Sequence, residues 1–122
     1  MVVRSGLTAD LSPGEVDRLF QALADATRRD ILERALQAEH TVSDLAAAYD
    51  MSFAAVQKHV AVLERAGLVT KRRHGRAQLV RGDVDVVRRA GHLLDALEAL
   101  WIGRLDRFGD ELGAGPSDPS PT

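Results

Sequence analysis

The stretch from Thr41 to Val69 constrains the fold most, because two short helical patterns follow each other there with almost no chain between them. The first opens with TVSD, in which Thr41 can cap a helix and Asp44 stands where a capping box usually has Glu. The second opens after Ser52, another N-cap residue, and ends at Gly67. Two capped helices joined by so tight a turn predict a helix-turn-helix.

The apolar residues of the second helical pattern lie on one side of it. Val56, Val60 and Leu63 recur at helical spacing and are expected to point into the core. The side chains between them must then face outward. Met51, just before this helix, is expected to fill the turn toward the core. The sequence thus predicts a helix over 53–66 with one buried face and one face free for a partner.

A basic segment follows this helix and has the pattern of a β-hairpin over 70–81. His74-Gly75 is the expected tip, because glycine adopts the turn conformation readily. Between Ser52 and Arg81, seven basic residues and one acid, Glu64, give a net charge of +6, whereas the whole chain carries −2. Such a basic patch on an acidic body is typical of a surface that meets phosphates, and a solvated surface without a partner is the alternative.

Helical patterns also flank the motif on both sides. Ser12 and Pro13 suit a first helix, Asp25 can cap a second, and Asp83 can cap a long last helix to about residue 112. The apolar stripe of the last helix is too long for so small a body to bury, so the remainder is expected to meet a second copy. The alternative is that this helix folds back onto the core. The expected fold class is mainly α with a small β-hairpin, a winged helix-turn-helix with a long C-terminal dimerisation helix.

Length and composition limit the chain to a single domain. It has 122 residues, of which 45% are hydrophobic and 28% charged, enough for one modest core. We expect a flexible arm over 1–12, the domain over 13–112 and a disordered tail, rich in Pro, Gly and Ser, over 113–122. No apolar run approaches a membrane span and no signal-peptide pattern is present, so a cytoplasmic protein without a membrane partner is expected.

Catalytic and metal chemistry find little support in the sequence. Without cysteine, the chain has no disulfide, no thiolate metal ligand and no cysteine nucleophile. The histidines stand apart without ligand spacing, and there is no phosphate-binding glycine loop or recognisable catalytic spacing. We therefore expect no enzyme, and neither a bound cofactor nor a metal ion.

The outward side of the second helix is the expected DNA-binding surface, because an α-helix fits the major groove. Gln57 can pair with adenine, and Lys58 can reach guanine or a phosphate. His59 has two open roles, one structural and one at the DNA backbone. The hairpin is expected to contact phosphates or the neighbouring minor groove. The DNA-binding candidates are Ser52, Phe53, Ala54, Ala55, Gln57, Lys58, His59, Lys71, Arg72, Arg73, His74 and Arg76.

Together these pieces resemble the ArsR family of winged helix-turn-helix repressors. The resemblance covers roughly 16–80 and rests on LFQALADATRRDIL, TVSDLAAAYDMSFAAVQKHVAVLERAGLV and KRRHGRAQLV. The ending ALWIGRLDRF looks like the cysteine-free branch of the family, which lacks an obvious metal site. Phe53-Ala54-Ala55 is more apolar than the usual start of the family's DNA-binding helix, so a base preference does not carry over.

The resemblance implies a homodimer that binds double-stranded DNA and represses transcription. In such proteins the first and last helices pair across the dimer. Ligand binding usually lowers their affinity for DNA, so the resemblance is compatible with a small-molecule effector of unidentified chemistry. The hypothesis is a homodimeric, sequence-specific regulator of transcription, and the alternative is a protein-interaction module whose DNA binding is vestigial. The dimerisation candidates are Val16, Phe20, Val87, Leu94, Leu97, Trp101 and Phe108.

Overall fold

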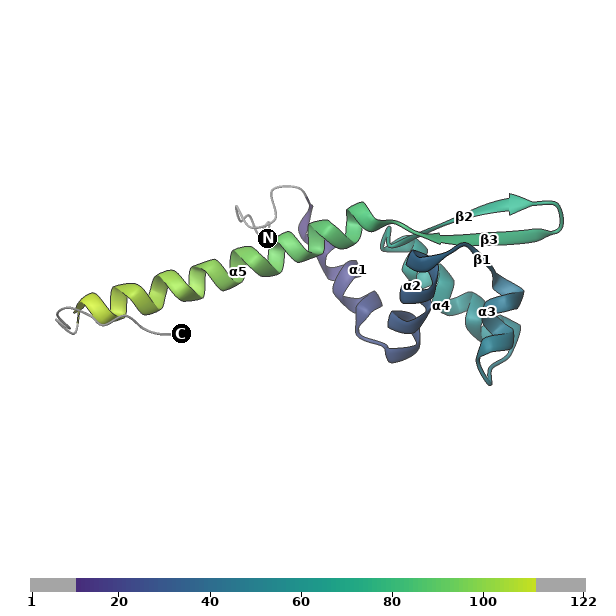
Figure 1. Ribbon diagram of the computed structural model, residues 1–122, viewed down its shortest axis with the longest axis horizontal. Coiled ribbons are helices and arrows are strands. Elements are labelled where there is room, and N and C mark those ends of the chain that lie inside the picture. The colour runs from purple at the N-terminus through teal and green to yellow at the C-terminus, as the bar shows by residue number, and fades with distance from the viewer. Residues whose placement is uncertain (1–10, 112–122) are drawn as a thin grey trace.

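The computed structural model describes the backbone of residues 11–111 and the side chains of residues 11–109. A small helical body carries a two-stranded projection at one end and a long helix at the other (Figure 1). The elements are α1 Pro13–Leu23, α2 Ala26–Gln37, β1 His40–Thr41, α3 Val42–Ala48, α4 Phe53–Arg65, β2 Val69–His74, β3 Ala77–Gly82 and α5 Val84–Glu111. The expected fold class, mainly α with a small β element and a long last helix, is confirmed.

The ends of the chain lie almost entirely outside the described residues. This applies to the tail expected over 113–122 and to the arm expected over 1–12, apart from its last two residues. Leu11 packs against the core, and Ser12 caps α1. Leu11 and Ser12 therefore belong to the packed body of the chain.

The helices start at the N-cap residues that the sequence predicts. At α1 the Ser12 hydroxyl accepts a hydrogen bond from the Glu15 backbone N–H at 3.1 Å, and the Glu15 carboxylate accepts one from the Ser12 backbone N–H at 2.7 Å. Each such cap satisfies a backbone N–H that the helix itself leaves free, a contribution of about 1 kcal/mol. Four other side chains accept equivalent bonds at α2, α3, α4 and α5: Asp25, Thr41, Ser52 and Asp83.

An aliphatic core holds α4 in place. Val56, Val60 and Leu63 are fully buried, as their spacing predicts, and each contributes on the order of 1.5–3 kcal/mol of burial energy. Met51 is 37% exposed, so the expectation that it fills the turn toward the core was wrong. Tyr49, two residues earlier, packs against the core there instead.

Two arginines at the start of α2 hold the end of α1. Arg28 Nε donates to the Ala22 carbonyl and Arg28 Nη2 to the Gln21 carbonyl, both at 2.9 Å. Arg29 Nη1 donates to the Leu23 carbonyl at 2.7 Å. The last carbonyls of a helix have no partner within it and form its negative end, so charged donors suit them. The two guanidinium groups thereby fix the packing of α1 against α2.

The sheet contains one more strand than the expected hairpin. β1 pairs with β3 in antiparallel register, His40 with Val80, which gives the strand order β1-β3-β2. Two residues are too few to show the alternating pattern by which a strand is recognised in a sequence. This short strand ties the start of α3 to the hairpin.

The hairpin formed by β2 and β3, residues 69–82, is called the wing from here on. His74 pairs with Ala77, which leaves Gly75-Arg76 as a two-residue loop. Gly75 has φ 64°, a conformation that glycine adopts at little cost. The tip therefore lies one residue later than the expected His74-Gly75.

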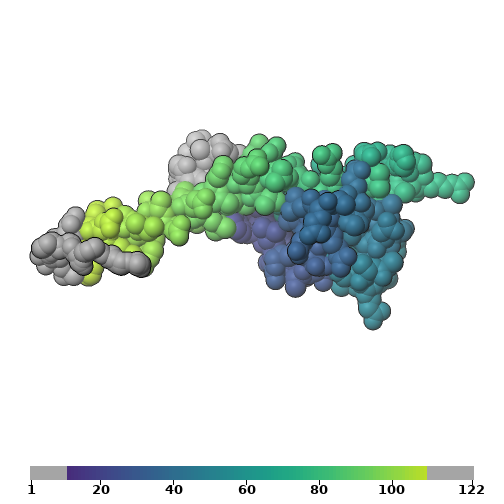
Figure 2. All heavy atoms as spheres, viewed as in Figure 1, coloured from purple at the N-terminus to yellow at the C-terminus, as the bar shows by residue number. Residues whose placement is uncertain are grey.

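The last helix packs on the body only with its first turns and then extends away from it (Figures 1 and 2). Its first turns pack against the core through Val86, Val87 and Ala90. The fold-back alternative holds only for this part, because most of the apolar side chains further along α5 are exposed. These are Leu94, Leu97, Leu100, Trp101, Ile102, Leu105 and Phe108. Within the described residues, no helix combines the length and the apolar character that a membrane span requires.

Candidate nucleic-acid interface

The second helix of the motif, α4, presents an exposed face opposite its buried one. Phe53 is 48% exposed, Ala54 and Lys58 are exposed, and Ala55 and Gln57 are half-buried. The Ser52 hydroxyl accepts the Ala55 N–H at 3.1 Å, so this residue is occupied as a helix cap. The exposed face is convex and about one helix wide, the shape that fits a DNA major groove.

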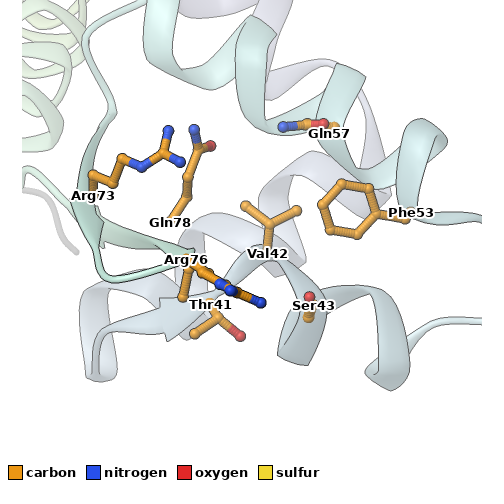
Figure 3. A pocket seen from close by; sticks show the side chains of 9 residues that line it. Thr41, Val42, Ser43, Phe53, Gln57, Arg73, Arg76 and Gln78 are labelled. Atoms are coloured by element: carbon orange, nitrogen blue, oxygen red, sulfur yellow. The ribbon is translucent and has the colours of Figure 1, made fainter.

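A hollow of about 250 Å³ separates the start of α4 from the wing (Figure 3). Four of the DNA-binding candidates meet here, Phe53 and Gln57 from α4 and Arg73 and Arg76 from the wing. An amide that can pair with a base edge therefore lies in the same concavity as two guanidinium groups. The other lining residues are Thr41, Val42, Ser43, Ala77 and Gln78.

Gln78 is a site residue that the sequence analysis did not identify. Its side-chain oxygen is buried and has no hydrogen-bond partner among the described residues. An unsatisfied buried acceptor costs about 1–3 kcal/mol. A partner that brings a hydrogen-bond donor into the hollow would remove this cost, and so would a rotation of the Gln78 amide toward a donor. The signal in the sequence was the strand period of two, since Gln78 lies on the same side of β3 as the buried Val80.

Two of the candidate cations of the wing are already paired within the chain. Lys71 Nζ lies 3.4 Å from Glu64 Oε1 of α4, and Arg72 Nη2 lies 3.3 Å from Glu39 Oε1. Among the described residues, Arg73, His74 and Arg76 form no ion pair within 4.0 Å. The positive charge available to a partner is therefore concentrated toward the tip of the wing.

His59 lies on the other flank of α4, against α2. Its Nδ1 is 3.4 Å from Arg28 Nη1, and the ring is half-buried. His59 follows Gln57 by two residues, a rotation of about 200° around the helix, so it points away from the hollow at the wing. Of its two open roles, this placement favours the structural one.

The dimerisation candidates fall into two groups. Val16 and Val87 are half-buried, and Val87 packs against the core of its own chain. Phe20 of α1 and four residues of α5, Leu94, Leu97, Trp101 and Phe108, are exposed. Figure 2 shows how far the end of α5 extends beyond the body.

The described residues contain no group of three His, Asp or Glu side chains that could hold a metal ion. Several of the polar contacts that are present lie at a single helix. Asp25, for example, caps α2 and lies beside Arg28, and the hydrogen bond from the Arg28 backbone N–H is the main cause that lowers the pKa of this carboxyl.

Comparison with known proteins gives a consistent result. A family model described as a helix-turn-helix domain matches residues 23–72. The uncharacterized HTH-type transcriptional regulator YuzN of Bacillus subtilis is 40% identical over 74 residues, which span 55% of this chain and 80% of that protein.

Solved structures extend the similarity beyond the motif. An ArsR family transcriptional regulator, RHA00566, is 30% identical with a TM-score of 0.69, over 83% of this chain and 96% of that one. The homodimeric winged helix-turn-helix DNA-binding domain Mb0332 of Mycobacterium bovis, a possible ArsR-family regulator, is 30% identical with a TM-score of 0.61. That similarity covers 80% of this chain and 91% of the Mycobacterium domain.

Proposed function

The chain belongs to the ArsR family of winged helix-turn-helix transcriptional regulators and is a DNA-binding regulator of transcription, and we propose that it acts as a homodimeric, sequence-specific repressor. The observation that carries the proposal is the hollow between α4 and the wing, where Gln57 shares a concavity with Arg73 and Arg76. Base readout and phosphate binding are thus adjacent on one surface.

In the proposed complex α4 enters the major groove. Gln57 reads a base edge, for which adenine is the matched partner, and Lys58 reaches guanine or a phosphate. Phe53, Ala54 and Ala55 pack against thymine methyl groups. The wing reaches the adjacent minor groove, so the DNA strand between the two grooves passes over the hollow. Arg73 and Arg76, which are free of ion pairs with described residues, neutralise its phosphates.

In the proposed homodimer the exposed part of α5 packs against a second copy. Leu94, Leu97, Trp101, Leu105 and Phe108 follow each other at intervals of three or four residues and form one stripe. An apolar stripe of this length on a small protein is typical of a partner surface, and a twofold contact is the simplest arrangement. The homodimeric relative with the same fold supports this proposal. Two copies of α4 would then meet successive major grooves, about 34–36 Å apart.

Repression follows from occupancy in this proposal, because a dimer over two half-sites covers a promoter. The test is binding to the DNA upstream of the protein's own gene, measured by fluorescence anisotropy at several salt concentrations, together with a reporter driven by that DNA. We expect a preference over random DNA of at least about 10³-fold, a steep fall of affinity with salt, and derepression when the gene is deleted. Equal affinity for random DNA would contradict sequence-specific binding and favour a protein-interaction module.

A further inference from the structure

A second hollow lies on the other flank of α4, away from the wing. Its volume is about 280 Å³, and three helices line it: Arg18 and Gln21 of α1, Arg28 of α2, and Val62 and Arg65 of α4. Val62 follows Phe53, which lines the hollow at the wing, by nine residues. Around the helix Val62 is about 180° from Phe53 and Arg65 about 80° from Gln57, so the two hollows lie on different flanks of α4.

Arg28 forms a fixed wall of this second hollow. Its guanidinium donates to the carbonyls of Ala22 and Gln21 and lies 4.0 Å from the Asp25 carboxylate. Its charge is therefore partly balanced, and its position is set by the packing of α1 on α2.

Arg18 and Arg65 supply the available charge. Both are exposed, neither forms an ion pair with a described residue within 4.0 Å, and no acidic side chain lines the hollow. Lys58, also exposed, precedes Arg65 by seven residues, about two turns, and so lies on the same side of α4. Two exposed arginines from different helices therefore line this concavity, Arg65 and Arg18, the second also near Glu15 of its own helix, and guanidinium groups are donors suited to a phosphate.

We propose that the Arg18–Arg65 hollow binds a DNA backbone phosphate on the side of the major groove opposite the wing. The proposal rests on the proposed function, because it requires α4 to lie in the groove. A major groove is about 12 Å wide and a helix with its side chains about 10–12 Å across, so a helix in the groove has a phosphate strand along each flank. The wing neutralises one strand, and this hollow neutralises the other.

The proposed dimer leaves this hollow open. Arg18 precedes Phe20 by two residues, so the two side chains leave α1 about 200° apart. Phe20 belongs to the apolar face expected at the partner, whereas Arg18 lines the hollow next to α4. Dimerisation and phosphate binding therefore use opposite sides of α1.

The test compares Arg18→Gln, Arg65→Gln and the double variant with Arg88→Gln, which removes the same charge from an exposed site on α5. Affinity for the operator and for random DNA is measured by anisotropy between about 50 and 200 mM salt. Loss of one phosphate contact should make the slope of log K against log salt shallower by about 0.9 and weaken both affinities by ~10-fold, with the specificity ratio unchanged. Arg88→Gln should leave the slope as in the wild type.

Phosphate ethylation interference locates the contact. The wild type should show interference on both strands that border the major groove, and the double variant should lose it only on the strand away from the wing. Arg18→Lys/Arg65→Lys keeps both charges and should keep the slope, which separates loss of contact from loss of fold.

Two results would overturn the proposal. If the double variant binds with the wild-type slope and ethylation pattern while Arg73→Gln makes the slope shallower, the hollow is not a DNA site and the proposed function stands. If titrated inorganic phosphate shifts the NMR signals of Arg18 and Arg65 and the DNA affinity of the double variant is unchanged, the hollow binds a free phosphate instead. Absence of any salt-dependent DNA binding by the wild type would reject the proposed function itself.

Discussion

The hydroxyl group of Tyr49 donates a hydrogen bond to Oδ2 of Asp30 and so joins the end of α3 to the middle of α2. Arg34 Nε donates to the same oxygen at 3.0 Å, and its guanidinium lies 5.4 Å from the centre of the Tyr49 ring. The Asp30 carboxylate thus accepts one hydrogen bond from the end of α3 and one from its own helix, α2. The helix-turn-helix is held to α2 by this cluster as well as by the apolar core.

Replacing Tyr49 by Phe keeps the ring and removes this bond. We expect the free energy of unfolding to fall by about 1–2 kcal/mol, because a hydrogen bond to a charged acceptor is lost at a partly exposed site. Chemical denaturation followed by circular dichroism measures the change. Ser43→Ala, which removes an exposed hydroxyl from α3, is the control and should change stability by less than about 0.5 kcal/mol.

The same cluster makes stability depend on pH at both ends of the range. Burial and the bond to Asp30 raise the pKa of Tyr49 from 10.0 to about 12, so its contribution is complete below about pH 10 and is lost between pH 10 and 12. The bonds from Tyr49 and Arg34 lower the pKa of Asp30 from 3.8, so that contribution is present above about pH 4 and is lost as the pH falls further. Tyr49→Phe should flatten the alkaline edge of a stability–pH curve. An unchanged alkaline edge would contradict this assignment.

Gln57→Ala is expected to reduce sequence discrimination without changing the dependence on salt. A paired contact to a base contributes about 1–3 kcal/mol of specificity, whereas an amide neutralises no phosphate. Competition binding with single-base operator variants should show one position at which the wild type discriminates and the variant does not. A shallower salt slope in this variant would place Gln57 at the backbone instead.

Glu64→Gln should strengthen DNA binding, because it releases Lys71 from its partner at 3.4 Å. A free lysine beside the groove can neutralise a phosphate, so the salt slope should become steeper, by up to about 0.9. The matched control is Glu33→Gln, which removes the same charge from an exposed position on α2. Equal effects of the two variants would indicate a general charge effect and no release of Lys71.

Trp101→Glu should weaken the proposed dimer. Trp101 is 56% exposed within the apolar stripe of α5, and a charge there would be buried without a partner on association. Sedimentation should show a dimer dissociation constant at least about tenfold higher. Ile102→Glu is a close control, because Ile102 is 51% exposed but turned by about 100° from Trp101. Similar weakening by both variants would argue against a twofold contact through this stripe.

Local signals predicted most of the fold. The N-cap residues Ser12, Asp25, Thr41, Ser52 and Asp83 fixed where the helices begin, because a cap is formed by residues two or three positions apart. Helical spacing likewise identified the buried face of α4. Short or irregular features gave weaker signals, which is why β1 was missed and Met51 was wrongly expected in the core.

The candidate site was less predictable, because its properties depend on residues distant in the sequence. Arg72 forms an ion pair with Glu39, which is thirty-three positions away in the sequence. A count of the charges near Arg72 in the sequence therefore could not show that this cation is paired. Arg18 and Arg65 come together only through the packing of α1 on α4. The sequence therefore predicted the helix α4 and the basic wing as the DNA-binding elements, whereas only the structure separates the paired cations from the free ones.

The exposed part of α5 has a consequence for gene dosage. If the proposed dimer is the form that binds a paired site, the active species grows with the square of the chain concentration while monomers predominate. Occupancy of the site then responds more steeply to the amount of protein than one-to-one binding does. Halving the copy number of the gene would consequently lower the dimer concentration about fourfold in that range, without any change in the contacts to DNA.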